Sequence, residues 1–449
     1  MKDKPMDLAY QITKYGARNG WSFEQLIKCS HLKTGTGDDR PKSEIKSTSG
    51  EQHSIAVSVS SKEKAKATSK TTKPTVDATA FDLVLRYAVN GTEEMTKLAE
   101  KFSLTEEPVY KYLLSVHEAK HMEECNVDKL INLIYINKLT REQVPTWALK
   151  NKEVLTALLV NVGKTRITMP LTALLRNLGN MSAYYALDDE IIRDILCKHL
   201  LNNDVITKSR IHPVNILTAW FTYRNGQGMR GNNTWHPHSD VLKALEEMFY
   251  LSFKNVEPTG KRICFLIDAS GSMQCPSLCE SVSNSEAAAL LAMIFSRSET
   301  KNDDCPNHSF YLFTSTRSSQ VRTYGSYTGL TDVSDLIHPK AKLGEVLKSV
   351  QRSDWGTTDI SMGILEAMKY RRKFDAFVVI TDCDVNSGIK PSEAMKQYRK
   401  ELNLPNAKLA VIGTQGSDFT IADPTDPFMM DFCGFDSHGP KLLQEFIKS

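Results

Sequence analysis

Three polar clusters in the second half of the chain carry residue types that could do chemistry. In the stretch FLIDASGSM, Asp268, Ser270 and Ser272 follow an apolar run. Thr358 lies in the stretch WGTTD. Asp382 directly follows the strand-like run AFVVIT. Hydroxyl and carboxylate oxygens in this combination could hold a hard cation, and a serine among them could act as a nucleophile.

The segments around these clusters alternate between strand-like and helix-like patterns. We expect strands at 262–268, 309–313, 376–381 and 408–413, separated by helices at 284–298, 342–351, 361–371 and 391–402. Such alternation predicts a parallel, doubly wound α/β sheet, in which ligands bind at the carboxyl ends of the strands. The three polar clusters lie where this rule places a site.

The residue types favour a metal site over two other kinds of site. A nucleophile elbow requires G-x-S-x-G, but Asp268 and Ser272 stand where the glycines belong. A phosphate-binding loop would use Gly163-Lys164-Thr165, but Leu158 occupies the position of its first glycine. Mg²⁺ suits an all-oxygen set of two serines and one threonine, with the aspartates acting through water and one position left open. A hydrolase that uses one of the serines remains an alternative.

The spacing of the three clusters resembles the von Willebrand factor A domain and its metal-ion-dependent adhesion site (MIDAS). The matching residues are Asp268, Ser270, Ser272, Thr358 and Asp382. The resemblance implies Mg²⁺ or another divalent cation as cofactor and a binding site rather than a catalytic one. In that family an acidic group of a partner protein usually fills the open metal position, so a divalent-cation-dependent adhesion module is the alternative function.

The first half of the chain shows helical periodicity interrupted by one biased segment. Apolar residues recur three and four apart, and the helix pairs carry no strand signals, which favours an α-solenoid of HEAT type. A Ser-, Thr- and Lys-rich segment has too few large apolar residues to fold and is expected to be disordered. We therefore divide the chain into helical repeats at 1–33, a low-complexity insertion at 34–78, HEAT-like helical repeats at 79–258 and an α/β domain at 259–449.

Several motifs, in order along the chain, resemble the Ro ribonucleoprotein autoantigen family, which joins an RNA-binding TROVE module to an A domain. They are KYGARNGWS (14–22), LIKCSHLK (26–33), MPLTALLRNLG (169–179), RIHP (210–213), GMRG (228–231), VEPTGKR (256–262), FTIADP (419–424) and FCGFD (432–436). The resemblance implies a ring of HEAT-like repeats closed by a Rossmann-like A domain. The helical region that the family has ahead of KYGARNGWS is absent from this sequence. Ring closure normally joins those early repeats to the A domain, so the sequence leaves both ring closure and the possibility of a fragment open.

The family resemblance implies a non-catalytic protein that binds Y-type small noncoding RNAs and the 3′ ends of misfolded small RNAs in RNA quality control. Its motif residues carried over as RNA contacts are Lys14, Arg18 and His31. The spacing of Lys14 and Arg18 would place both on one helix face, as a phosphate clamp requires. Four further basic residues are candidates for a phosphate-binding surface, namely Lys28, Lys33, Arg176 and Arg210.

Composition agrees with a soluble protein of this kind. The chain has 449 residues with a formal net charge of +3, and its basic excess lies in the first half. No apolar stretch approaches the length of a membrane span, and the first residues lack a signal-peptide core. Nine cysteines show no zinc-like pairing. We expect a monomer without membrane partners in the cytoplasm, with the nucleus as a second location.

Overall fold

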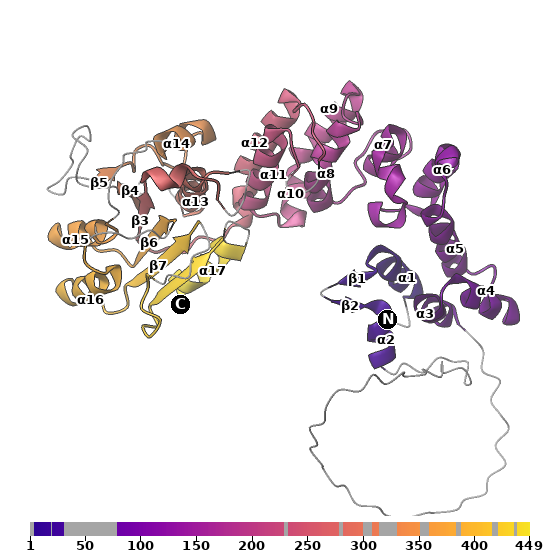
Figure 1. Ribbon diagram of the computed structural model, residues 1–449, viewed down its shortest axis with the longest axis horizontal. Helices are drawn as coiled ribbons and strands as arrows, with labels where there is room; N and C mark the ends of the chain where they lie inside the picture. The colour runs from indigo at the N-terminus through magenta and orange to yellow at the C-terminus, as the bar shows by residue number, and fades with distance from the viewer. Residues whose placement is uncertain are drawn as a thin grey trace, which may run out of the picture. The chain divides into compact units, whose positions relative to one another are not determined.

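The computed structural model describes residues 4–18, 20–30, 79–228, 232–277, 282–299, 308–313, 330–350, 359–382, 388–414, 421–434 and 438–449 (Figure 1). The chain divides into two compact units, Met1–Leu158 and Leu159–Ser449. The insertion that we expect to be disordered, 34–78, lies outside the described residues. The two compact units divide between Leu158 and Leu159, and not at the domain boundary that we predict at 258–259. That boundary stays a prediction.

The first unit is built from helices. Its α-helices are α1 (Pro5–Lys14), α2 (Phe23–Cys29), α3 (Ala80–Asn90), α4 (Thr92–Lys101), α5 (Pro108–Lys120), α6 (Val127–Asn137) and α7 (Lys152–Leu159), which runs to the start of the second unit. Short 3₁₀ turns lie at η1 (Glu124–Asn126), η2 (Arg141–Gln143) and η3 (Thr146–Lys150). Only Gly91, with a left-handed φ of +84°, separates α3 from α4, and a glycine adopts that conformation without strain.

A buried amide joins three segments of the first unit. Gln143, in η2, has no solvent exposure. Its Nε2 donates to Thr13 Oγ1 of α1 and to Tyr112 Oη of α5, each at 2.7 Å. Because an unsatisfied buried amide would cost free energy, these two bonds fix the positions of α1, α5 and η2 relative to one another.

A two-stranded hairpin connects α1 to α2, where we predicted helix. Strand β1 (Ala17–Arg18) pairs in antiparallel fashion with β2 (Trp21–Ser22). The prediction that Lys14 and Arg18 share a helix face is therefore wrong, because α1 ends at Lys14. The sequence carries the physical reason, since an Asn-Gly step between short strands is the usual signal of a tight hairpin turn, and Gly20 has φ +80°.

The second unit begins with helices and continues into the α/β sheet. Its first helices are α8 (Leu171–Ala183), α9 (Glu190–Leu200), α10 (Asn203–Ser209), α11 (Pro213–Asn225) and α12 (Ser239–Leu251), followed by η4 (Ser252–Asn255). Tyr250 at the end of α12 connects this helix to a later segment of the unit. Its Oη accepts the backbone N–H of Leu343 at 2.9 Å. The Arg297 guanidinium lies over the same ring, 4.4 Å from its centroid.

Six strands form one sheet within the described part of the second unit. They are ordered β5 (Leu330–Asp332), β4 (His308–Phe313), β3 (Ile263–Asp268), β6 (Ala376–Thr381), β7 (Lys408–Gly413) and β8 (Met429–Cys433). The four predicted strands are confirmed as β3, β4, β6 and β7, and they run parallel to one another. The expectation of a wholly parallel sheet is wrong at one edge, because the three-residue strand β5 pairs antiparallel with β4. A short antiparallel edge strand on a parallel sheet is common in α/β folds.

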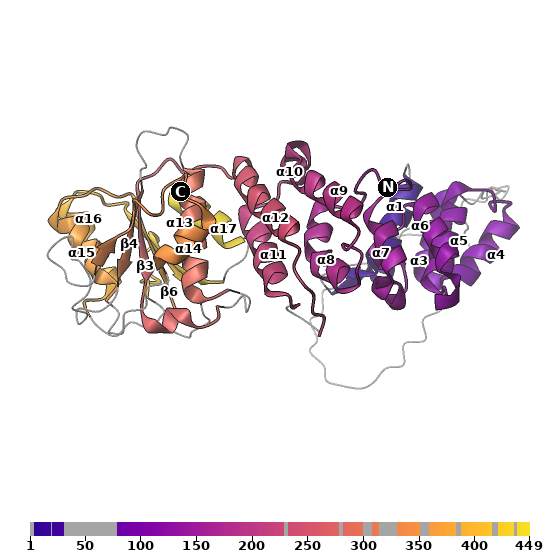
Figure 2. The ribbon, with the colours of Figure 1, turned by 90° about the horizontal axis from the view of Figure 1, so that it is seen from above.

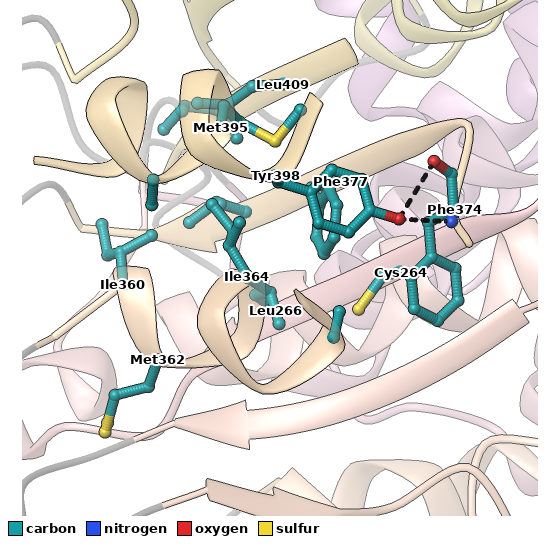
Figure 3. Close-up of a cluster of buried hydrophobic side chains, with 14 of the residues drawn as sticks. Cys264, Leu266, Ile360, Met362, Ile364, Phe374, Phe377, Met395, Tyr398 and Leu409 are labelled. Carbon is teal, nitrogen blue, oxygen red and sulfur yellow. Dashed lines mark hydrogen bonds between the residues drawn. The ribbon is translucent and has the colours of Figure 1, made fainter. Parts of the chain in front are cut away.

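Helices cover both faces of this sheet, as a doubly wound fold requires (Figure 2). They are α13 (Asn284–Ser298), α14 (Leu343–Val350), α15 (Ser361–Lys369), α16 (Pro391–Glu401) and α17 (His438–Lys448). Neighbouring residues of β3 serve opposite faces, since Phe265 contacts Phe295 of α13, with ring centroids 5.2 Å apart, whereas Leu266 lies in the cluster that α15 and α16 cover. Figure 3 shows that cluster, in which Tyr398 Oη accepts the backbone N–H of Phe374 at 2.6 Å.

Candidate functional site

The strand order places one candidate site at the carboxyl ends of β3 and β6. From β3 the chain continues to β4 on one side of the sheet and later returns to β6 on the other side. This reversal is the topological switch point, where open α/β sheets bind ligands. Asp268 is the last residue of β3, and Asp382 follows the last residue of β6. The predicted residues that the structure describes therefore meet at the expected place.

Asp268 is fixed by hydrogen bonds from two segments. Thr381 Oγ1 donates to Asp268 Oδ2 at 2.6 Å, and the backbone N–H of Ser270 donates to Asp268 Oδ1 at 2.8 Å. The side chain is only 1% exposed. Burial, with a further contribution from the nearby carboxylate of Asp382, raises the pKa of Asp268 to about 6, although the Thr381 and Ser270 hydrogen bonds oppose the shift. The site thus holds a carboxylate in a position where an ion of opposite charge would relieve the cost of its burial.

The two serines present their hydroxyls side by side. Ser270 has an extended backbone, and the following 3₁₀ turn η5 (Gly271–Gln274) is anchored by the fully buried Met273. This turn brings Ser270 Oγ within 3.0 Å of Ser272 Oγ. Adjacent ligands of an octahedral Mg²⁺ ion, each about 2.1 Å from the metal, lie about 3.0 Å apart. The hydroxyl spacing therefore fits two neighbouring ligands of Mg²⁺.

The second polar cluster also reaches this end of the sheet. Thr358 lies outside the described residues, but the next residue, Asp359, is described. Its Oδ1 accepts from the backbone N–H and the hydroxyl of Ser361, at 3.0 and 2.6 Å, at the start of α15. A Cβ built on Gly388, in the loop after β6, would lie 2.1 Å from the same oxygen. Asp359, which follows Thr358 in sequence, thus lies against Gly388, between β6 and α16.

The donor set of this site suits a hard cation. The oxygens of Asp268, Ser270, Ser272 and the largely buried Asp382 are those that Mg²⁺ prefers. The hydroxyl of Ser270 bonds that of Ser272, so the two serines present neighbouring oxygen donors. No group of three or more His, Cys, Asp or Glu side chains suited to a metal occurs among the described residues. The site depends on serine hydroxyls instead.

Lys14, the described member of the RNA motif at the end of α1, is held between two tyrosines. Its Nζ donates to Tyr10 Oη at 2.9 Å and lies 5.1 and 5.3 Å from the ring centroids of Tyr10 and Tyr15. Burial lowers the pKa of Lys14, but the hydrogen bonds and charge interactions with the two tyrosines outweigh it and the net pKa is raised. The ammonium therefore stays charged on a half-buried stem, which suits a phosphate contact.

The other candidate RNA residues divide between described and undescribed parts of the chain. Lys28 is exposed on α2 and pairs with Glu24 at 2.6 Å. Arg176 on α8 and Arg210 at the end of α10 are exposed, and neither has an ion pair within the described residues. The side chain of Arg18 and the residues His31 and Lys33 lie outside the described residues. The roles of all seven residues stay predictions.

Thr381 belongs to the site, although it is not among the predicted metal ligands. Its hydroxyl makes the 2.6 Å bond to Asp268, 113 residues away in sequence. Its place directly before Asp382, at the end of a strand, was the available signal. Residue spacing alone could not show that it bonds to the strand beside its own.

Two family models cover most of the chain. A TROVE domain model matches residues 1–221, and a Ro60 vWA domain model matches residues 262–447. Among the described residues, no helix is long and apolar enough to cross a membrane.

Comparisons with known proteins agree with these models. The RNA-binding protein RO60 of Caenorhabditis elegans is 32% identical over 454 residues, covering 98% of this chain and 63% of that protein. The RNA-binding protein RO60 of Deinococcus radiodurans is 33% identical over 316 residues, covering 69% of this chain and 54% of that protein. The crystal structure of the Deinococcus radiodurans RO (RSR) protein matches with a TM-score of 0.72 and 27% identity, covering 98% of this chain and 73% of that one. The chain spans less than two thirds of the length of these two curated relatives, and it belongs to the Ro family of TROVE and vWA domain proteins.

Proposed function

We propose that this protein binds RNA through its helical part and does not catalyse a reaction. The observation that carries the proposal is the similarity, over 98% of this chain, to a protein named RNA-binding protein RO60. The exposed or half-buried basic side chains of the TROVE region supply a means of contacting phosphates. The same similarity favours RNA binding over the adhesion alternative, because the curated relatives are named for RNA.

The proposed RNA class is small noncoding RNA, namely Y-type RNAs and the single-stranded 3′ ends of misfolded small RNAs. Lys14, Arg18, Lys28 and Lys33 would contact phosphates, and His31 would stack on a base or bond a phosphate. Arg176 and Arg210, in the second unit, would also contact phosphates. Phosphate contacts of this kind fix the position of an RNA but carry little sequence information, which suits a protein that accepts varied misfolded RNAs.

For the sheet-edge site we propose Mg²⁺ or another divalent cation. Ser270, Ser272 and Thr358 would bind the ion directly, and Asp268 and Asp382 would act through water. When bound, the cation would offer an open coordination position to an acidic group of a partner protein. The donor types and the 3.0 Å spacing of the serine hydroxyls support this assignment.

We further propose that the protein is a monomeric, cytoplasmic component of a ribonucleoprotein particle in RNA quality control. The test is to crosslink RNA to the protein in cells and sequence it, comparing wild type with the Lys14→Ala, Arg18→Ala, His31→Ala triple variant. We expect small RNAs to be enriched with the wild type and depleted with the variant. If the wild type enriches no small RNA, the proposal fails. Cation-dependent capture of a protein that survives the triple substitution would support the adhesion alternative instead.

A further inference from the structure

A pair of histidines at the end of α5 forms a second cluster with the chemistry of a metal site. His117 and His121 are four residues apart, so they lie on one face of the helix. Their ring centroids are 4.2 Å apart, and the ring planes are tilted by 41°. Two histidines at this helical spacing are the pair that zinc-binding helices use.

One hydrogen bond fixes the His121 ring and its tautomer. Its Nδ1 lies 2.7 Å from the backbone carbonyl oxygen of His117. A carbonyl oxygen can only accept, so Nδ1 carries the proton and Nε2 keeps its lone pair. Metal-binding histidines usually donate their other ring N–H in this way.

The His117 ring is held in the same manner by α4. Its Nδ1 lies 2.9 Å from the hydroxyl oxygen of Thr92, the first residue of that helix. When Nδ1 donates to this hydroxyl, Nε2 of His117 also has a free lone pair. Each ring can therefore offer an Nε2 lone pair, which is the group that binds a metal ion.

The surroundings leave the pair accessible to a hydrated ion. His117 lines an open cavity of about 650 Å³ together with Thr92, Glu93 and Glu94. His121 is exposed. The ammonium of Lys120, between the two histidines in sequence, donates to the carbonyl oxygen of Thr13 at 3.3 Å and is thus engaged by α1.

We propose that His117 and His121 form a two-histidine site for a borderline divalent transition metal such as Zn²⁺, with water at the remaining positions. Imidazole nitrogens select this class of ion, whereas the oxygen donors at the sheet edge select a hard cation. Within the described residues no third His, Cys, Asp or Glu joins the pair, so the site is open rather than a closed structural zinc site.

The proposed site is not that of a zinc hydrolase. The segment His117–His121 reads HEAKH and matches the zinc-protease motif H-E-x-x-H, whose glutamate acts as general base. Here the Glu118 carboxylate lies 2.5 Å from the Lys129 ammonium on α6. This ion pair engages the Glu118 carboxylate, which would otherwise serve as the base. The two histidines would therefore bind a metal without hydrolytic chemistry.

The test is calorimetric titration of the full chain with ZnCl₂ in excess Mg²⁺, which occupies oxygen-donor sites. We expect one zinc equivalent to be lost in His121→Ala, whose side chain is exposed, and in His117→Gln. Thr92→Val should weaken zinc binding by about tenfold, because outer-shell partners of histidine ligands have effects of about 10- to 100-fold. Glu118→Gln is the matched control and should bind zinc as the wild type does.

Circular dichroism and metal-free thermal unfolding establish that each variant is folded. The proposal is overturned if folded His121→Ala binds as much zinc as the wild type with the same affinity. It is equally overturned if Glu118→Gln loses zinc as strongly as His121→Ala, since that result would make the carboxylate a ligand.

Discussion

The site at the edge of the sheet and the lysine at the end of α1 are built in different ways. Asp268 is held by Thr381, 113 residues later in the chain, and is almost completely buried. Lys14 is held by Tyr10 and Tyr15, four residues before it and one after it. The first site exists only when the sheet is folded, whereas the second needs little more than its own helix. Substitutions that open the core of the sheet should therefore change stability as well as binding, whereas substitutions near Lys14 should change binding alone.

The largest expected effect comes from opening the core beneath the sheet site. Leu266→Ala removes a fully buried side chain of β3 and should lower the free energy of unfolding by about 2–5 kcal/mol. Leu26→Ala is the matched change in the first unit, where α2 has no buried residues and Leu26 is 48% exposed. Denaturant unfolding should show a change below about 0.5 kcal/mol for it. Equal losses from the two substitutions would contradict the contrast between the regions.

Acid should weaken the second unit through a buried histidine. His212 begins α11 by accepting the backbone N–H of Val214 at its Nδ1, and burial, followed by Lys441, lowers its pKa from 6.5 to about 4. Below pH 6.5 the unfolded chain binds the proton first, so stability should fall by up to about 3 kcal/mol between pH 6.5 and pH 4.

His212→Asn isolates this effect, because asparagine caps a helix as well and does not titrate in this range. Asp268 has the opposite influence, since its raised pKa costs stability as the pH rises from about 4 to about 6. The difference between wild type and His212→Asn, measured by urea unfolding at several pH values, removes that contribution. A difference that does not vary with pH would contradict the assignment.

Removing the charge of Asp268 should separate metal binding from metal-free stability. With Mg²⁺ at a hundredfold excess over its dissociation constant, the wild type should gain about 2.7 kcal/mol. Asp268→Asn keeps the shape of the side chain and should lose this gain, with a small change in metal-free stability. Asp375→Asn is the matched control, because Asp375 pairs with Arg262 before β6 begins, away from the carboxyl end of that strand. It should lower the melting temperature but keep the gain from Mg²⁺, and thermal unfolding with and without Mg²⁺ compares the two.

The smallest expected effect is on RNA affinity. Lys14→Ala should weaken RNA binding by about 1 kcal/mol and reduce the salt slope by about one ion, without a change in unfolding. Lys28→Ala should have a smaller effect, because its ammonium already pairs with Glu24. Fluorescence anisotropy at several salt concentrations checks both. A larger loss from Lys28→Ala would show that the tyrosine-held lysine is not the main contact.

The strands and helices around the sheet site could be predicted because their sequence patterns are long and strong. Strands β6 and β7 occupy the predicted ranges, and β3 lies one residue inside its range. Strand β5 was not predicted, since its three residues become a strand only by pairing with β4. The hairpin at Ala17–Ser22 differs from the predicted helix for another reason, because its two strands have two residues each and its main sequence signal is one Asn-Gly step.

Side-chain partners across the fold were harder to predict than the elements. The types and order of Asp268, Ser270 and Ser272 indicated the kind of site, but the bond from Thr381 depends on which strands are neighbours. The histidine pair could have been found from its spacing. The hydrogen bond between His117 and Thr92, 25 residues earlier, could not be predicted, because it depends on the packing of α4 against α5.

The central claim is that RNA binds the helical part and not the metal site. The direct measurement is the dissociation constant for a small RNA with a single-stranded 3′ end, in three proteins. They are the wild type, the Lys14→Ala, Arg18→Ala, His31→Ala variant and the Ser270→Ala, Ser272→Ala variant. We predict that the first variant binds at least about tenfold more weakly than the wild type, and that the second binds as the wild type does. Loss of RNA binding in the serine variant with normal binding in the helical variant would contradict the claim.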